Sequence, residues 1–452
     1  MSRPLLIRAG HVLTMDDAGT IAGGEVLIDG DRIAAVGTDL DPTGAEVLDR
    51  PDAIVLPGFV DAHRHTWQTS VRHCAVGWDL AAYQANIQGT VGERLTPEDA
   101  HIANLLGGLS ALDAGITTLR DESHAQNSPA HTDALIAGLR EAGIRACFAY
   151  GWPSTDAMRW LWDSELALPE DIRRVRAEVL DDDDALVTLQ AHLRGPELAN
   201  LEVTRADVAR ARELGLRMSM HMGTGVYGEL HHGIAALQRA GLLGDDMTFV
   251  HCCTSDDEEL AMAAAAGASA CVTPAVEASM PGLGRPATGR LLARGLRPAL
   301  GVDIEIATPG DLFSQMRAAL AAERLGGGDA PLDAEDLVAF ATIDGARALG
   351  LDDRIGSLAA GKQADLIVVD LGDAALAPAT DPVGSLVAAG HPGAVETVIV
   401  AGVVRKRGGR LTHPDVGAVV HRARRSAERL LAPVMAGAGA AASPPIPGGE
   451  NA

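Results

Sequence analysis

The sequence predicts an α/β protein: a (β/α)8 TIM barrel joined to a small β-sandwich domain that is built from both ends of the chain. Three observations lead to this prediction. The chain has 452 residues, enough for a large enzyme fold and an appendage. Its middle alternates strand-like and helix-like segments over roughly 290 residues, the usual size of such a barrel. Short hairpin-like strands occur near the start and return near the end.

The two ends of the chain both contain short β-prone segments. Residues 25–33 place Asp29-Gly30 between β-prone arms, which is typical of a hairpin turn. Residues 364–369 are a further strand candidate, and residues 398–405 form a second hairpin. We therefore expect residues 1–56 and 355–412 to build one discontinuous β domain.

The middle of the chain, residues 57–354, is the predicted barrel. Its opening strand leads through Pro57-Gly58 into Phe59-Val60, and a helix is predicted to begin at Thr96, because Pro97 suits a first turn and acids follow it. Gly115 is expected to stop that helix. Further strands are expected at 116–120, 145–150, 186–191, 217–220, 248–250, 269–273 and 298–302, with helices such as 133–139, 258–265 and 310–324 between several of them.

An open doubly wound sheet would show the same alternation of strands and helices. No Gly-X-Gly-X-X-Gly follows an early strand, so the dinucleotide-binding version of that fold lacks its motif and the barrel is favoured. After the β domain, residues 413–435 are rich in arginine and are expected to form a peripheral helix. Residues 436–452 are mostly Ala, Gly and Pro, which predicts a disordered tail.

Composition and charge exclude several classes of partner. There are 61 acidic and 37 basic residues, a formal net charge of −24, so nucleic acid and membrane surfaces are not expected to bind. The start lacks the apolar core of a signal peptide, and the five cysteines form no Cys-X-X-Cys pair, which indicates reduced thiols. We expect a cytoplasmic enzyme with a small-molecule substrate; a homodimer is common for such barrels.

Polar residues cluster where the predicted strands end, which is where barrel enzymes place their chemistry. The opening strand ends in His63 and His65, and alternate side chains of a strand project to the same side. Two neutral imidazoles there would suit a transition metal. The other polar or aromatic residues expected at this edge are Asp121, Glu122, Tyr150, Trp152, His192, His221, His251, Thr273 and Asp303.

These motifs resemble the amidohydrolase superfamily, and more closely its branch of cytosine-deaminase-like and triazine-hydrolase-like (chlorohydrolase) enzymes. The resemblance rests on Pro57–His65, on His221 after a fifth strand, on Val250-His251-Cys252 and on Gly301-Val302-Asp303. It covers nearly the whole chain, including residues 356–365, a stretch that typically precedes the C-terminal strands of the family.

The resemblance implies one divalent metal ion, usually zinc, with iron and manganese as alternatives. Its ligands would be His63, His65, His221 and Asp303. Asp303 would also take a proton from the attacking water and pass it on, while His251 would orient that water or polarise the substrate. Some members bridge two metals with a carboxylated lysine. Both lysines of this chain lie in its C-terminal part, outside the barrel, so a single metal is expected.

The sequence departs from the family pattern at Thr224. In the deaminase-like branch a glutamate normally stands there, three residues after the third metal-binding histidine, and shuttles a proton to a ring nitrogen. A threonine hydroxyl does not carry a proton near neutral pH, and such assistance is typically worth ~10² to 10⁴ in rate. Glu305 is the first candidate to replace it and Glu122 the second. Glu229, Glu277, His124 and His192 are further polar candidates.

The leading hypothesis is a metal-dependent hydrolase that cleaves a non-peptide C–N bond in a small cyclic substrate, such as a deaminase of a nitrogen heterocycle. The substrate-binding candidates are Trp67, Gln68, Trp152, His192 and Thr224, with Trp78 and Tyr83 in segments that could line the mouth. A lyase, isomerase or cyclase on the same scaffold is the alternative that Thr224 suggests. A catalytically inactive binding protein is a third reading, against which the intact ligand positions count.

Overall fold

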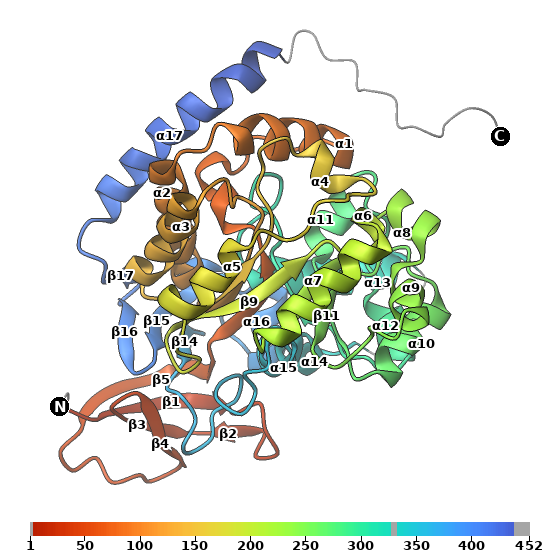
Figure 1. Cartoon of the computed structure of the whole chain (residues 1–452). Coiled ribbons are helices and arrows are strands. Elements are labelled where there is room, and N and C mark those ends of the chain that lie inside the picture. The colour runs from red at the N-terminus through yellow and green to blue at the C-terminus, as the bar shows by residue number, and fades with distance from the viewer. Residues whose placement is uncertain (1–2, 327–331, 438–452) are drawn as a thin grey trace.

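The computed structural model describes residues 3–326 and 332–437. Eight parallel strands follow one another around the barrel in chain order (Figure 1), which confirms the predicted fold class. The barrel strands are β6 (Phe59–Arg64), β7 (Ile116–Ser123), β8 (Arg145–Tyr150), β9 (Val187–Leu193), β10 (Met218–Met222), β11 (Met247–His251), β12 (Ser269–Val272) and β13 (Ala299–Leu300).

The barrel closes between β6 and the residues just after β13. The backbone N–H of Asp303 donates to the carbonyl of His63 at 2.8 Å, and the N–H of His65 donates to the carbonyl of Asp303 at 2.8 Å. Gly301 permits this approach, because a Cβ at that position would lie 2.8 Å from both Cβ and the carbonyl oxygen of His63. The conformation of the last strand is therefore tied to the first strand at the position of the two histidines.

A buried carboxylate reinforces the closure. Asp61, which is fully buried, accepts a hydrogen bond from the backbone N–H of Val302 at 2.9 Å and pairs with Arg64 at 3.1 Å. Its interactions join the first strand to the segment that carries Asp303. A buried ionised carboxylate is tolerated in this position because its oxygens are paired and hydrogen-bonded.

Helices connect the barrel strands and cover the outside of the barrel (Figure 1). The helix predicted at Thr96 is present: the Thr96 hydroxyl accepts from the Asp99 N–H, and the Asp99 carboxylate accepts from the Thr96 N–H. The connecting elements are η1 (Thr66–Val71), α1 (Leu80–Tyr83), η2 (Gln84–Val91), α2 (Pro97–Asp113), α3 (Pro129–Ala142), α4 (Met158–Leu161), α5 (Asp171–Arg174), η3 (Val175–Val179), α6 (Gly195–Leu198), α7 (Leu201–Glu213), α8 (Val226–His231), α9 (Gly233–Arg239), α10 (Asp257–Ala265), α11 (Pro274–Ser279), α12 (Thr288–Ala293), α13 (Leu312–Leu325), α14 (Ala334–Phe340) and α15 (Ile343–Leu349).

Strands from both chain ends share one continuous nine-stranded sheet, which runs from the lower left side of the barrel to below it in Figure 1. The long strand β5 pairs in parallel with β1 and antiparallel with β14, which joins the N-terminal strands to the C-terminal ones. One core packs between these strands, with Ile7, Val55 and Leu366 among its buried members. The strands are β1 (Leu5–Leu13), β2 (Thr20–Ala22), β3 (Glu25–Asp29), β4 (Arg32–Gly37), β5 (Glu46–Pro57), β14 (Leu366–Asp370), β15 (Val395–Val400), β16 (Val403–Arg407) and β17 (Arg410–Leu411), with α16 (Pro382–Ala389) and η4 (Pro392–Ala394) between β14 and β15.

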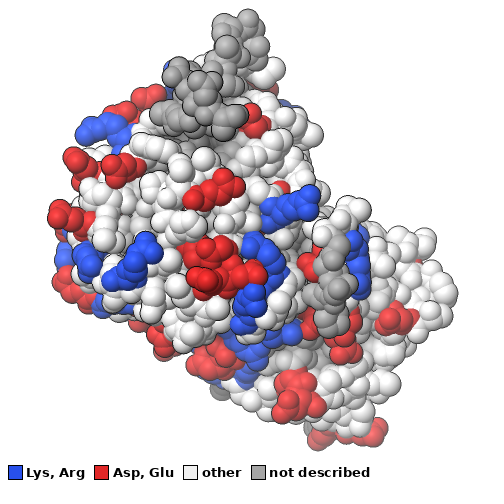
Figure 2. All heavy atoms as spheres, turned by 90° about the vertical axis from the view of Figure 1, so that its right-hand side faces the viewer, with Lys and Arg blue, Asp and Glu red and all other residues white. Residues whose placement is uncertain are grey.

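The peripheral helix is α17 (Val416–Gly437), which packs beside α2 (Figure 1). Its Ser426 hydroxyl donates to the Asp99 carboxylate at 2.6 Å, and Arg429 pairs with the same carboxylate. The tail expected over 436–452 lies outside the described residues from 438 onward. None of the described helices combines the length and the apolar character that a membrane span requires. On the face in Figure 2, acidic and basic side chains are interspersed.

The closure of the barrel can be tested at Gly301. We expect Gly301→Ala to lower the free energy of unfolding by about 1–3 kcal/mol, because the added methyl group meets backbone as well as side-chain atoms of His63. Urea denaturation measures the change. Gly37→Ala is the matched control, since the nearest atom to its Cβ would be 3.8 Å away. Equal losses in both variants would contradict the proposed role of the close contact.

Candidate active site

Four polar residues from separate parts of the chain converge at the C-terminal mouth of the barrel. His63 comes from β6, His65 directly follows that strand, His221 comes from β10, and Asp303 from the segment after β13. The Nε2 atoms of His63 and His65 lie 3.1 Å and 3.4 Å from the Asp303 carboxylate. The ring of His221 lies 5.1 Å from that of His63 and 5.4 Å from that of His65, centroid to centroid. The structure thus brings the four expected ligand side chains together.

The outer nitrogens of His63 and His65 have protein partners that orient the rings. The Nδ1 atom of His65 donates to the carbonyl of Glu122 at 2.6 Å, and Nδ1 of His63 lies 3.1 Å from the Glu122 carboxylate. Burial lowers the pKa of His65 and of His221 well below the ordinary value, which favours neutral imidazoles. Neutral rings whose outer nitrogens are fixed by oxygen acceptors are the usual arrangement around a protein-bound metal. The donor set therefore fits a transition metal such as zinc.

His63 lies between two carboxylates, Glu122 and Asp303. Burial alone would lower the pKa of His63, but these two carboxylates outweigh it and raise that pKa to about 10. Burial would raise the pKa of the Asp303 carboxyl, but the hydrogen bond and the charge of His63, with His251 and His65 beside it, hold that pKa below its ordinary value. The two buried carboxylates, Glu122 and Asp303, favour a positive charge between them, which a divalent ion would supply.

His251 lies beside the cluster, and two neighbouring residues orient its ring. Its Nε2 lies 4.0 Å from the second oxygen of Asp303, and its Nδ1 lies 3.1 Å from the buried carboxylate of Glu277 and 3.1 Å from the hydroxyl of Thr273. The ring stacks on that of His221 at 5.3 Å with an angle of 17°. His251 and Asp303 both have positive φ, at 77° and 63°. Such backbone is unfavourable for side-chain-bearing residues and is typical of functional sites.

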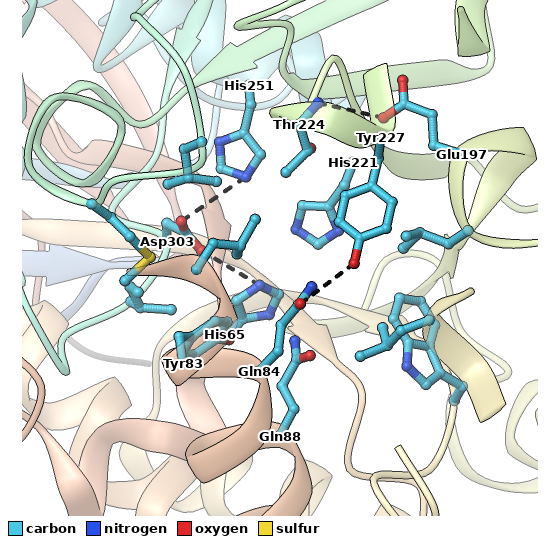
Figure 3. Close-up of a pocket in the computed structure, with 17 residues that line it drawn as sticks. His65, Tyr83, Gln84, Gln88, Glu197, His221, Thr224, Tyr227, His251 and Asp303 are labelled. Carbon is cyan, nitrogen blue, oxygen red and sulfur yellow. Dashed lines mark hydrogen bonds and ion pairs between the residues drawn. The ribbon is translucent and has the colours of Figure 1, made fainter. Parts of the chain in front are cut away.

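A pocket opens next to the cluster (Figure 3). Trp152, Tyr83 and Tyr227 supply aromatic groups, and two glutamines, Gln84 and Gln88, supply amides. The remaining wall is mainly apolar. The lining residues are His65, Leu80, Tyr83, Gln84, Gln88, Trp152, Leu161, Glu197, Leu198, His221, Thr224, Tyr227, His251, Met280, Leu283, Asp303 and Ile304.

Three of the predicted site residues lie outside the pocket lining. Glu305 faces away from the pocket: its carboxylate binds Arg64 at 3.0 Å and Thr69 at 2.7 Å. It therefore does not stand where the missing glutamate would. Trp67 and Gln68 are buried and do not line the pocket; the Gln68 amide instead donates to the Tyr83 hydroxyl at 2.7 Å. Trp67 packs in the apolar core of the barrel.

Glu122 and His192 lie behind the cluster, and Trp152 and Thr224 lie at the pocket. The Glu122 carboxylate is 2.9 Å from Nδ1 of His192 as well as 3.1 Å from His63, so it links a candidate ligand to a second histidine. His192 is fully buried under Trp152, with ring centroids 4.6 Å apart. The hydroxyl of Thr224 is buried and has no hydrogen-bond partner among the described residues.

Glu197, in α6, is a pocket residue that sequence reasoning missed. Its carboxylate accepts hydrogen bonds from the backbone N–H groups of Gly223 at 2.7 Å and Thr224 at 3.4 Å. Burial raises the pKa of Glu197 to about 7. The carboxyl group thus supports the turn that carries Thr224, directly beside the place where a glutamate was expected (Figure 3). No motif in the sequence linked the loop after β9 to that turn.

Residues 54–405 of the chain match the Amidohydrolase family. The chain belongs to this family. It is similar to the 5-methylthioadenosine/S-adenosylhomocysteine deaminase of Desulforudis audaxviator, 29% identical over 94% of this chain and 99% of that protein. It is also similar to the 5'-deoxyadenosine deaminase of Methanosarcina mazei, 27% identical over 95% of this chain and 99% of that protein.

Among solved structures, the chain resembles an adenosine deaminase from Xanthomonas campestris with bound zinc, with a TM-score of 0.81, 26% identity and coverage of 94% of this chain and 98% of that one. Atrazine chlorohydrolase from Arthrobacter aurescens TC1, complexed with zinc, shares the fold, with a TM-score of 0.80 and 22% identity over 94% of this chain and 100% of that one. The chain is therefore a metal-dependent amidohydrolase that acts on non-peptide C–N bonds, as the sequence predicted.

The link between Glu122 and His63 gives a test of how the metal is held. We expect Glu122→Gln to weaken metal affinity about 10- to 100-fold, because an amide cannot accept hydrogen bonds through both of its polar atoms. Competition with a chelator measures the change. Glu25→Gln alters a buried carboxylate in the small β domain, paired with Arg8, and should leave metal affinity unchanged. Comparable weakening in both variants would contradict the role given to Glu122.

The raised pKa of Glu197 predicts a pH dependence of stability. Between about 4.5 and about 7 Glu197 keeps a proton in the folded chain that it releases in the unfolded chain, so the contribution of Glu197 to stability falls as pH rises through this range. The fall should be on the order of 2–3 kcal/mol and be largely absent in Glu197→Gln. Urea unfolding at several pH values measures the slope. Glu229→Gln, at an exposed carboxylate, is the control; an unchanged slope in Glu197→Gln would argue against this assignment.

Proposed function

We propose that this protein is a hydrolytic deaminase that uses one zinc ion to remove an exocyclic amino group from an aminated purine or pyrimidine ring. The observation that supports this most is the convergence of three imidazoles and a carboxylate at a pocket of mainly apolar and amide character. Relatives named as deaminases of adenine nucleosides align over nearly the full length of the chain, which agrees with this reaction.

The ion would be held by His63, His65, His221 and Asp303. When bound, it would lower the pKa of a water molecule and polarise the carbon under attack. Asp303 is placed to accept the proton of that water, because one of its oxygens faces the cluster and the other faces His251. It would then deliver the proton to the departing amine.

His251 would position the attacking water. Its Nδ1 is held by Glu277 and Thr273, which leaves Nε2 directed toward Asp303. A neutral ring in this orientation accepts a hydrogen bond from water and orients its lone pair toward the substrate. The stacked contact with His221 keeps the ring from turning.

Thr224 shapes the proton transfers in this proposal. The carboxylates among the described pocket-lining residues are Asp303 and Glu197, and the Glu197 carboxylate binds the backbone at Gly223 and Thr224. Asp303 is therefore assigned both the proton taken from water and the proton given to the leaving group. The Thr224 hydroxyl is enclosed and has no hydrogen-bond partner among the described residues, so it is not assigned a proton.

The threonine at position 224 supports one second candidate. This is a non-hydrolytic lyase, isomerase or cyclase that would use the metal only to polarise its substrate. Oxygen-18 water separates the two. Incorporation of one solvent oxygen into the product is the result that hydrolysis requires, and a product of unchanged mass would favour the second candidate.

Ammonia release tests the proposed reaction directly. We expect zinc-loaded protein to release ammonia from at least one compound in a panel of aminated purines and pyrimidines, offered as free bases and as nucleosides. Chelation should abolish the release and added Zn²⁺ should restore it. Asp303→Asn should lower kcat by at least ~10³, since it removes both a ligand and the proton carrier. Turnover that survives chelation, or no turnover across the panel, would refute the proposal.

A further inference from the structure

The short helix α8 borders the pocket through Tyr227 and is weakly packed. Among its residues, Val226–His231, only Gly228 is buried, while Val226 is 38% and Leu230 is 61% exposed. A helix this short is not stable by itself, and a segment with few buried apolar contacts opens more readily than the core around it. The position of α8 therefore depends on the contacts at its two ends and on Tyr227.

Both ends of α8 have left-handed backbone. Gly225, before the helix, has a φ of 52° and a ψ of −134°, and His232, after it, has a φ of 47°. Glycine adopts the first of these conformations readily and other residues rarely do. The N–H of Gly225 donates to the carbonyl of Leu283 at 2.8 Å, which fixes this end to a neighbouring loop. Hinges consist of a few such residues at the ends of an element, so these two positions suit a hinge.

One buried carboxyl group contacts the chain on both sides of α8. Glu197, in α6, accepts hydrogen bonds from the backbone N–H groups of Gly223 at 2.7 Å and Thr224 at 3.4 Å, before the helix. After the helix it packs against Gly233, where a Cβ would lie 2.8 Å from Oε1 of Glu197. Hydrogen bonds of this kind contribute about 0.5–1.5 kcal/mol each. They are strong enough to hold a short helix and weak enough to break reversibly.

Tyr227 makes a contact across the pocket. Its hydroxyl donates to Oε1 of Gln84 at 3.5 Å, which joins α8 to η2 (Figure 3). The ring also packs beside Trp162, with centroids 5.5 Å apart. The hydrogen bond is long, and the side chains of Tyr227 and Gln84 are both partly exposed. Separation of the two side chains therefore costs little free energy.

The space that the pocket encloses is small. Its cavity volume is about 60 Å³, whereas sites for small molecules usually enclose about 300–1,000 Å³. The barrel strands behind the cluster are buried, and close-packed cores of this kind do not expand readily. The room that a substrate needs must therefore come from the elements at the mouth, and α8 is one of these with little support.

We propose that α8 is a lid of the active site, which moves about Gly225 and His232 to admit the substrate and then returns Tyr227 to its contact with Gln84. Glu197 is the positioning residue that holds the lid closed. The inference concerns access to the cluster and goes beyond the proposed function, because it does not depend on which bond the enzyme cleaves.

Removal of zinc by a chelator tests the lid without a substrate. Dipicolinate has to pass the mouth to reach the ion, so its rate of zinc removal from the full-length zinc-loaded protein reports access. We expect Tyr227→Ala to speed removal about 10-fold without changing zinc affinity, because the contact that closes the pocket is lost. Val226→Ala, at the neighbouring exposed residue, is the matched control and should leave the rate unchanged. Equal rates in Tyr227→Ala and the unmodified protein would overturn the lid.

A covalent link tests the closed state from the opposite direction. Gln84→Cys and Tyr227→Cys are combined in a Cys74→Ser background, because Cys74 is the cysteine that is not buried. Dibromobimane then joins the two introduced thiols. The linked protein should lose zinc to dipicolinate at least 10-fold more slowly than before linking, and the two single-cysteine variants treated with the reagent are the controls. Failure of the link to form, or an unchanged rate after linking, would contradict the proposal.

Hydrogen exchange tests the role of Glu197. Glu197→Leu removes the acceptor and should raise exchange at residues 226–232 about 10-fold while α7 is unchanged. Glu197→Gln keeps an amide oxygen for the N–H of Gly223 and should raise it less. Glu202→Leu, at an exposed carboxylate of α7, is the control and should leave α8 unchanged. Unaltered exchange in α8, or equal acceleration throughout the chain, would refute the role of Glu197.

The outcomes separate the lid from the proposed function. Slow loss of zinc from the linked protein, with no ammonia released by the unlinked protein from any compound of the panel, would refute the deaminase assignment alone. Ammonia release that continues at the same rate after linking would refute the lid alone.

Discussion

The pairing of Asp303 with His63 and His65 through backbone hydrogen bonds is the constraint on which the site depends. These two bonds, each 2.8 Å long, close the barrel, and they also set the Asp303 carboxylate beside two imidazoles. The same two hydrogen bonds therefore close the barrel and assemble the site. The absence of a side chain at Gly301 is what allows the last strand to come this close to the first. A fold that closed elsewhere would separate the carboxylate from the histidines.

Around the closure of the barrel the protein buries several carboxylate and imidazole groups. Glu122 and Glu277 are almost completely enclosed, and each faces the outer nitrogen of a histidine at 3.1 Å. His251 and Asp303 adopt positive φ values as well. Burial of carboxylates and left-handed backbone both oppose folding. A metal ion in the cluster would offset part of this cost, and loss of the ion should therefore affect stability as well as chemistry.

Much of the fold and part of the site could be predicted because their signals are local. The helix at Thr96 begins with a cap and an acid within one turn, and its predicted start is correct. The β8 strand at Arg145–Tyr150 is a short apolar run whose bounds agree with the prediction. Strand ends of a parallel barrel meet at one mouth, so histidines at those ends were expected to gather. Glu305 does not follow this logic, because it lies in a turn two residues after Asp303, where Arg64 and Thr69 hold its carboxylate outside the pocket lining.

The sequence alone determined the barrel, the sharing of the small β domain between both ends, and the set of polar residues offered at the mouth, because strand periodicity, turn residues and strand-end positions are encoded within a few neighbouring residues. Tertiary structure decided which of those residues face a common space. Glu197 reaches Gly223 and Thr224 only because α6 packs beside the turn after β10. The Gln88 amide meets the His124 ring only because η2 lies against the barrel mouth beside His124. Gln88 and His124 are 36 positions apart in the sequence. No local sequence pattern specifies a contact between residues so far apart along the chain.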